Sequence, residues 1–172
     1  MTDDIDGVWT GFYTHRRNRC AITARFAISV GDLRGSMTDT VLVHEWTLAE
    51  LRADYGMTAD QADGVLAGIR AYLPGAAASD VISVSRLPPT AELSGYAQGP
   101  VVRFRKQYQG VGWAGWRVGE HLFGCQVPGH AVEYEGELTG DGTRVAGRWW
   151  IPANPAAGTV DAEGMFELRR GR

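Results

Sequence analysis

The chain has 172 residues, 44% of them hydrophobic and 22% charged, which is enough for one folded domain and unlike a disordered protein. The formal net charge of −3 argues against a nucleic-acid or anionic-membrane surface, because phosphate binding needs a basic footprint. No apolar leader opens the sequence, and no apolar run reaches the length of a membrane helix. We therefore expect a cytoplasmic protein whose Cys20 and Cys125 are free thiols.

Alternation of apolar and polar residues is the dominant pattern of the sequence. The expected strands cover residues 8–15, 21–30, 33–41, 91–98, 101–108, 130–139, 143–151 and 162–170. A further short strand is indicated at 81–87, just before Pro88 and Pro89. Asp141 and Gly142 are typical of a short hairpin turn. The pattern predicts an antiparallel sheet with strands that are neighbours in sequence paired side by side.

Six of the eight strands carry a glycine on the face that the alternation points inward. These glycines are Gly11, Gly35, Gly95, Gly136, Gly147 and Gly164. A glycine inside a strand marks a tight bend or a close approach of another group. One in most strands predicts a sheet that closes into a small barrel.

The charged residues of the outward faces indicate which strands are neighbours. The strand at 130–139 presents Glu133, Glu135 and Glu137, whereas the strands expected beside it present Arg103 and Arg105 on one side and Arg144 and Arg148 on the other. Opposite charges that face each other across strands stabilise a sheet by about 0.2–1 kcal/mol per pair. The pattern places the acidic strand between the two basic ones.

One segment, at about 45–78, has a helical period instead. Thr47 with Glu50, and Thr58 with Gln61, both fit the capping box that begins a helix. The second helix carries an apolar stripe, which we expect to pack against the barrel wall, with a lid or a dimer interface as the alternative. Its members are Ala62, Val65, Leu66, Ile69, Tyr72 and Leu73. The prediction is a single domain, residues 1–172, with a two-helix insertion between the third and fourth barrel strands and a stop at Pro74.

With these residues in view, the chain resembles the calycin-type barrels, the group that holds lipocalins, fatty-acid-binding proteins and avidins. Gly7-Val-Trp9 opens the first strand as Gly-x-Trp does in lipocalins, and the resemblance implies that Arg170 or Arg169 packs against Trp9. The segments 33–37 and 145–149 are similar to glycine-containing strands of avidin-like proteins. The resemblance implies binding of a small molecule inside the barrel. It implies neither biotin nor haem, because the matching side chains are not found, and we expect no cofactor.

The inward faces also carry polar and aromatic side chains, and these define the candidate site. A pocket with such a lining would hold a small apolar or amphipathic molecule and orient it through its polar groups. The candidate ligand-binding residues are Tyr13, His15, Phe26, Met37, Asp39, Phe104, Lys106, Tyr108, His130, Tyr134 and Trp149. A buried charge is costly unless it is paired, so Asp39 and Lys106 are expected to be paired, near an open end, or used.

Two alternatives to a binding protein stay open. In the first, the barrel is a small enzyme of isomerase, cyclase or hydrolase type, with His15 as general base, Asp39 orienting it, and Lys106 or Tyr108 stabilising an oxyanion. In the second, the interior is filled and the protein binds a partner through the helical insertion or the 110–129 segment. We expect a monomer or a homodimer. The common strings of catalytic and nucleotide-binding sites are not found.

The segment 110–129 is predicted to be a flexible loop. Gly110, Gly112 and Gly115 match a dinucleotide-binding string, but further glycines follow and no helix is expected to begin there. Trp113 and Trp116 are expected to pack against the inserted helices, with closure over a ligand or contact with a partner protein as the alternative. The spacing of His121, Cys125 and His130 is looser than that of zinc sites, which favours a buried thiol and two solvated imidazoles over a metal.

Overall fold

The computed structural model describes residues 5–152 and 162–171. They form two compact units, and the chain passes from one to the other four times. The barrel unit comprises the residues up to 42, residues 88–110 and those from 128 onward, and the sheet–helix unit comprises 43–87 and 111–127. Each unit has its own sheet. The expectation of a single domain stays a prediction.

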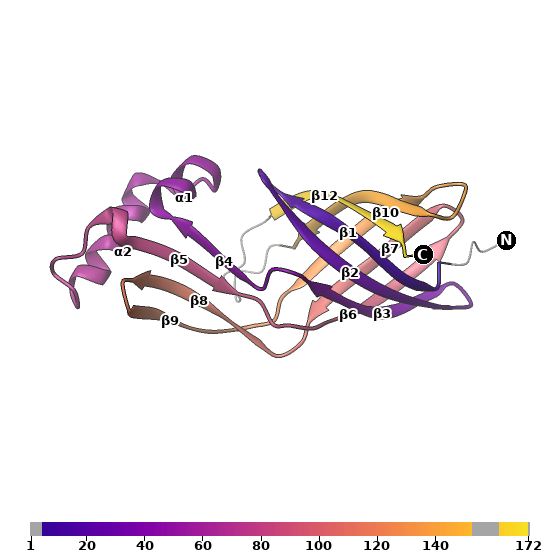
Figure 1. Cartoon of the computed structure of the whole chain (residues 1–172), viewed down its shortest axis with the longest axis horizontal. Helices are drawn as coiled ribbons and strands as arrows, with labels where there is room; N and C mark the ends of the chain where they lie inside the picture. Colours follow the sequence, from indigo (N-terminus) through magenta and orange to yellow (C-terminus); the bar gives the residue numbers. More distant parts are fainter. Residues whose placement is uncertain (1–4, 153–161, 172) are drawn as a thin grey trace. The chain divides into compact units, whose positions relative to one another are not determined.

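The barrel unit contains the eight strands that the alternation predicts. They are β1 (Gly7–His15), β2 (Asn18–Ser29), β3 (Asp32–Asp39), β6 (Ala91–Gln98), β7 (Val101–Tyr108), β10 (Ala131–Leu138), β11 (Arg144–Ile151) and β12 (Ala162–Arg170). They close in the order β1-β12-β11-β10-β7-β6-β3-β2, and each strand is antiparallel to both of its neighbours (Figure 1). The closed antiparallel barrel is confirmed, and closure removes the free edges of the sheet.

The inward glycines lie where neighbouring strands approach most closely. A Cβ atom at Gly95 would collide with the backbone of Arg103 and Phe104, and a Cβ at Gly35 would collide with the carbonyl of Arg25. Four of the six glycines lie directly across from a large aromatic residue of the next strand. These pairs are Gly35 with Phe26, Gly95 with Phe104, Gly147 with Phe166 and Gly164 with Trp149. The glycines therefore let the sheet bend, and the opposite rings fill the space they leave.

The rings form a continuous core in the barrel half that holds Trp9. Phe26 lies between Trp9 and Phe104, with ring centroids 6.1 and 5.3 Å away. Phe104 stacks on Tyr134 at 4.8 Å, and Phe166 meets both of them edge-on. All five side chains are almost fully buried. Rings of this size supply most of the apolar area of a small core.

Trp9 is held at its end of the barrel by contacts from the residues just before β1 and from the last residue of β12. Its indole Nε1 donates to the carbonyl of Ile5 at 2.9 Å. Arg170, directly across from Trp9 in β12, places its guanidinium 5.6 Å from the indole ring and donates to the carbonyl of Asp6. The expected packing of Arg170 on Trp9 is confirmed.

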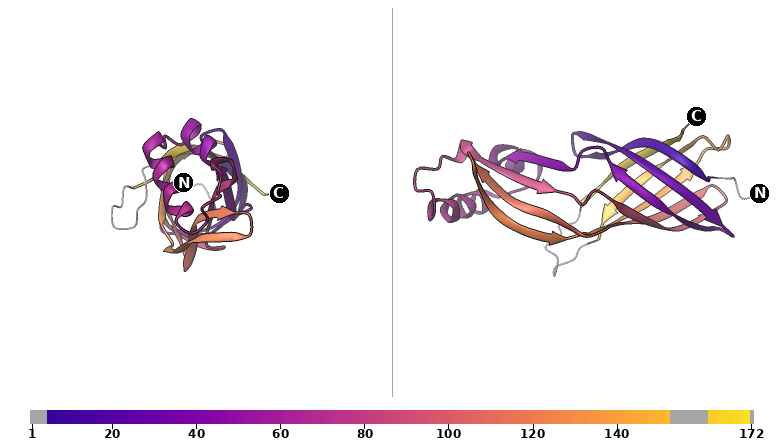
Figure 2. Two further views of the ribbon diagram at one scale, coloured as in Figure 1. Left: turned by 90° about the vertical axis from the view of Figure 1, so that its left-hand side faces the viewer. Right: turned by 60° about the horizontal axis from the view of Figure 1, so that its bottom comes forward.

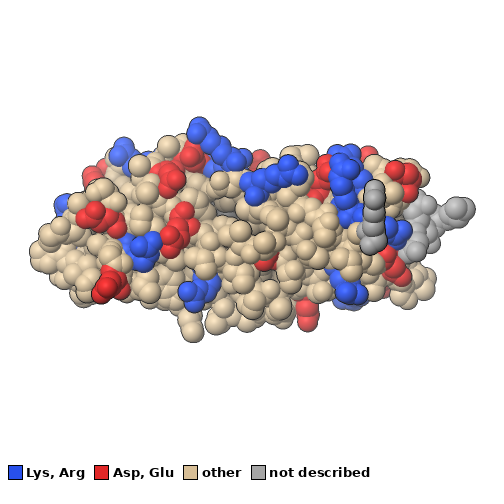
Figure 3. All heavy atoms as spheres, in the orientation of Figure 1, with Lys and Arg blue, Asp and Glu red and all other residues tan. Residues whose placement is uncertain are grey.

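The outward charges pair as predicted. Glu135 lies between Arg103 and Arg148, at 3.6 and 3.4 Å, and Glu133 lies 3.7 Å from Arg105. Figure 3 shows cationic and anionic side chains interspersed on the face in view, rather than gathered by sign. Exposed pairs of this kind contribute at most about 1 kcal/mol each, so their main role is to favour this strand order.

The sheet–helix unit contains the remaining elements. They are β4 (Val43–Thr47), α1 (Leu48–Asp54), α2 (Ala59–Arg70), the 3-10 turn η1 (Ala78–Asp80), β5 (Val81–Arg86), β8 (Val111–Val118) and β9 (His121–Pro128). The strand order is β4-β5-β8-β9, and Figure 2 shows the two helices beside this sheet. The helices follow β4 rather than the third barrel strand directly. No helix among the described residues is long and apolar enough to cross a membrane.

Both predicted capping boxes are present at the starts of α1 and α2. The apolar stripe of α2 packs against Val81 and Val118 of this unit's own sheet, so the expectation that it packs against the barrel wall is wrong. The helix ends at Arg70 and does not continue to Pro74. Tyr72, expected in the stripe, is 76% exposed. The stripe thus forms a second, smaller core.

The prediction of a flexible loop at 110–129 is wrong. This segment forms the hairpin of β8 and β9, in which Gly115 and Gly124 lie so close that the indole of Trp113 covers both. The glycines that interrupt the alternation are the residues that leave room for this ring over the strands. Trp116 packs against the core beneath α2, as predicted. The same prediction is wrong for Trp113, because its ring lies over the glycines of its own hairpin.

Candidate functional site

A cluster of polar side chains lies inside the barrel, at the end away from Trp9. We call this the polar end; it is defined by Tyr13, Cys20, Asp39, Lys106, Tyr108 and His130. Each of these residues comes from the inward phase of its strand, or from the residue just before it in the case of His130. The alternation of the strands therefore brings five of the six together, and the connection into β10 adds His130.

Asp39 and Lys106 form a buried ion pair at the centre of this cluster. Lys106 Nζ lies 2.6 Å from Asp39 Oδ2, and the two side chains are 0% and 2% exposed. The Tyr108 hydroxyl donates to the same carboxylate oxygen at 2.9 Å, and Lys106 Nζ donates to the Tyr108 oxygen at 2.9 Å. The three polar atoms form a triangle, so each fixes the position of the other two.

The second carboxylate oxygen, Asp39 Oδ1, is buried and accepts no hydrogen bond from any residue that the structure describes. Among the described residues, only one other buried side-chain nitrogen or oxygen atom has no hydrogen-bond partner. This atom is Arg144 Nε, and the same guanidinium is paired with Glu167 on the outer side of the barrel. A buried acceptor without a donor costs about 1–3 kcal/mol. Asp39 therefore has an unused capacity to bind a donor at the polar end.

Burial controls the protonation of the surrounding groups. Desolvation, followed by the nearby charge of Asp39, raises the pKa of Tyr108, and it does the same for Tyr134. Desolvation raises the pKa of Tyr13 as well, and burial also raises the pKa of the Cys20 thiol. The phenols and the thiol thus stay protonated at neutral pH and are able to donate hydrogen bonds, as Tyr108 does.

Desolvation also lowers the pKa of the Lys106 amine, while the charge of Asp39 opposes that effect. It lowers the pKa of His130 too, with a further contribution from the charge of Lys106. The His130 ring lies 4.9 Å from the ring of Tyr108. At neutral pH the site therefore offers a neutral imidazole next to the phenol.

His130 gives the barrel a testable dependence on acid. Below about pH 6.5, the unfolded chain binds a proton that the buried imidazole resists, so stability falls as the pH drops and levels off below the folded pKa. We expect the free energy of unfolding of His130→Gln to lack this pH-dependent contribution. The difference in free energy of unfolding between the wild type and the variant at about pH 7.5 should therefore shrink by about pH 5. Urea unfolding at several pH values measures it. Identical pH slopes for the two proteins would contradict the assignment.

The other candidate residues lie around the cluster or beneath it. Tyr13 and His15 both meet the indole of Trp149 edge-on, at 5.6 Å between ring centroids, and Trp149 donates to the carbonyl of Thr14. Met37 lies one inward position below Asp39. Phe26 and Phe104 belong to the ring core around Trp9. The structure gathers the polar candidates at one end, with the apolar ones below.

For the enzyme alternative, the geometry changes the role of Asp39. The hydrogen bonds of Asp39 go to Lys106 and Tyr108, whereas His15 packs on Trp149. The carboxylate therefore acts on the amine and the phenol. A general base at His15 stays a prediction.

Two features of the site were not predicted from the sequence. The first is Cys20. The strand β2 begins at Asn18 rather than at residue 21, so Cys20 shares the inward face of Ile22, and extending the alternation backwards by one inward position would have found it. The second feature is that the chain contains a single lysine, which lies at this site. Of the 17 Lys and Arg residues in the chain, Lys106 is the only lysine, and it is fully buried.

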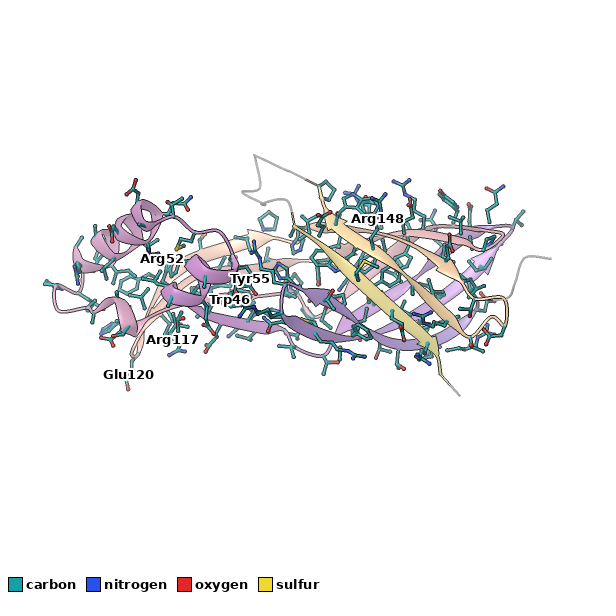
Figure 4. All side chains as sticks on the ribbon, turned by 90° about the horizontal axis from the view of Figure 1, so that it is seen from above. Trp46, Arg52, Tyr55, Arg117, Glu120 and Arg148 are labelled. Carbon is teal, nitrogen blue, oxygen red and sulfur yellow. The ribbon has the colours of Figure 1, made fainter. Side chains whose placement is uncertain are left out.

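The sheet–helix unit has a hollow of its own between α1, α2 and η1. It has a volume of about 380 Å³, and Arg52 and Asp63 line it together with alanines, leucines and two hydroxyl residues. Figure 4 labels Arg52 on α1. No group of three or more His, Cys, Asp or Glu side chains within the described ranges could hold a metal ion. The hollow lacks a buried polar atom in need of a partner, which separates it from the polar end.

No protein family, curated protein or solved structure matches the chain. The eight-stranded closed antiparallel barrel is compatible with a calycin-like fold. Any function must therefore be argued from the site itself.

Proposed function

We propose that the barrel binds a small, partly apolar molecule at its polar end, and that this molecule donates a hydrogen bond to Asp39 Oδ1. The observation that carries the proposal is this buried carboxylate oxygen, which no described residue satisfies. Native proteins pair almost all buried polar atoms, and an exception calls for an explanation. A hydroxyl or amino group of a bound molecule supplies the missing donor.

The surroundings support a molecule with an apolar body. Trp149 and Tyr134 are nearly fully buried, and Tyr13 packs its ring against Trp149 beside the polar cluster. Binding sites for small molecules are typically lined by such side chains, with a few polar groups that fix orientation. Since the rings around Trp9 fill the other half of the barrel, the molecule is small and confined to the polar end.

The buried ion pair adds a second argument. Moving two charges out of water costs several kcal/mol for each ion, and a well-packed apolar pair of similar volume often stabilises a protein as much or more. Stability alone therefore gives no reason to keep Asp39 and Lys106 in this position. A role in orienting a ligand does, because the pair fixes the free oxygen of Asp39 in one place.

A small enzyme is the second candidate. It is favoured by the contact of a carboxylate, an amine and a phenol within hydrogen-bond distance, a set able to move protons on a bound substrate. It predicts that Asp39→Asn abolishes turnover while the fold is kept.

Native mass spectrometry of the freshly purified protein tests the binding proposal, beside the same sample measured after denaturation. We expect a discrete additional mass that denaturation releases, and we expect its occupancy to fall at least about tenfold in Asp39→Asn, the loss expected for one charged hydrogen bond. Asp32→Asn is the matched control, because Asp32 is exposed at the other end of the same strand. An apo mass for the wild type that stays unchanged on incubation with small apolar alcohols would overturn the proposal.

A further inference from the structure

The single lysine of the chain points to a chemistry that its arginines cannot perform. Every other Lys or Arg position of the chain is an arginine, and the ion pairs on the surface of the described residues all use arginine. A guanidinium stays protonated and is a very weak nucleophile, whereas a lysine amine can lose its proton and attack a carbonyl carbon. The one primary amine among the side chains lies fully buried in the barrel.

We propose that Lys106 forms a protonated imine with an aldehyde whose apolar body lies against the rings of the polar end. This inference rests on the proposed function and names the chemical class of its ligand. A buried amine among aromatic side chains, with a carboxylate at 2.6 Å and a phenol at 2.9 Å, is the arrangement that such a reaction needs.

The step balances with the groups present. Asp39 Oδ2 accepts a proton from the ammonium of Lys106, and the free amine attacks the aldehyde carbon, so that a C–N bond forms and the carbonyl π bond breaks. The Asp39 carboxyl returns its proton to the carbonyl oxygen. The nitrogen of the adduct then gives a second proton to Asp39, which passes it to the new hydroxyl, and this group leaves as water. The total is one ammonium and one aldehyde giving one protonated imine and one water, with no oxidant or reductant.

Each neighbour of Lys106 has a part in this sequence. Asp39 Oδ2 is the first proton acceptor, and its carboxylate remains as the counterion of the imine nitrogen. Asp39 Oδ1, which accepts from no described residue, can receive a hydrogen bond from the hydroxyl of the addition intermediate. Tyr108 touches both charged groups and can pass a proton between them. Desolvation, which lowers the pKa of the amine, favours its reactive neutral form.

Reductive trapping tests this proposal directly. The full-length protein is incubated with hexanal, cinnamaldehyde or decanal in the presence of cyanoborohydride, which reduces an imine to a stable amine and adds the mass of the aldehyde less one oxygen atom. Peptide mapping then compares Lys106 with the α-amino group of the chain, the only other primary amine. We expect Lys106 to be labelled faster with at least one aldehyde, and at least about tenfold more slowly in Asp39→Asn than in the control Asp32→Asn.

Labelling confined to the α-amino group across the whole series would overturn the imine. The corresponding alcohols, 1-hexanol, cinnamyl alcohol and 1-decanol, separate this failure from that of the proposed function, because they can donate to Asp39 and cannot form an imine. If an alcohol binds to the wild type and not to Asp39→Asn while Lys106 stays unlabelled, the imine fails and the binding function stands. If neither alcohols nor aldehydes bind, both proposals fail.

Discussion

Lys106→Met is expected to lower the free energy of unfolding by about 3–5 kcal/mol, because it leaves the carboxylate of Asp39 buried without its cation. Lys106 Nζ is the closest partner of that carboxylate, and neither side chain has appreciable contact with solvent. Methionine has a similar length and no polar atom that could replace the amine. Urea unfolding followed by tryptophan fluorescence measures the change.

Two comparisons make this result specific to the pair. The double variant Asp39→Leu with Lys106→Met should recover most of the loss, since it removes both charges at once. Arg148→Met, which breaks an ion pair with Glu135 on the outer face of the barrel (Figure 4), should cost no more than about 1 kcal/mol. A single variant at Lys106 that is as stable as the wild type would show that the pair is not buried as described.

Gly95→Ala is expected to destabilise the barrel by about 3 kcal/mol or more, at the upper end of overpacking. The new Cβ would occupy the place of the Arg103 carbonyl and the Phe104 Cα in β7. A flexible side chain could move aside, whereas here the backbone of a central strand would have to shift. The paired ring of Phe104 lies within the aromatic core, so the shift would spread into it.

Gly68→Ala is the matched control for this substitution. Gly68 lies within α2, and a Cβ there meets no atom within 4 Å. The same chemical change should stabilise the protein by about 0.5–1 kcal/mol, because alanine is the better helix former. Thermal unfolding monitored by circular dichroism compares the two. Changes in thermal stability of the same sign and size in both variants would contradict the close approach of the strands at Gly95.

The barrel could be predicted because its signals are local and repeated. Each strand alternates, the charges of neighbouring strands match, and the inward glycines such as Gly95 and Gly147 lie opposite large rings. Threonines 47 and 58 mark both helix starts by a spacing of three residues. These features depend on residues close in sequence or on simple pairing rules, and so they can be read without coordinates.

The parts that could not be predicted depend on distant contacts. Gly115 and Gly124 break the alternation of β8 and β9, and only the ring of Trp113 lying over both explains why they belong to strands. Asp39 and Lys106 could be placed on inward faces, but their 2.6 Å contact depends on the order of β3, β6 and β7 around the barrel. The unsatisfied oxygen of Asp39 depends in turn on that contact.

The most direct test of the account follows from the single lysine. Protein grown with lysine labelled by ¹³C at Cε gives one side-chain signal in the NMR spectrum, and that signal reports on the centre of the site. We predict that it titrates below the ordinary lysine pKa of about 10.4 and differs between freshly purified protein and protein that was unfolded, dialysed and refolded to remove its ligand. A signal that titrates like that of an exposed lysine, and is the same in both samples, would contradict the account.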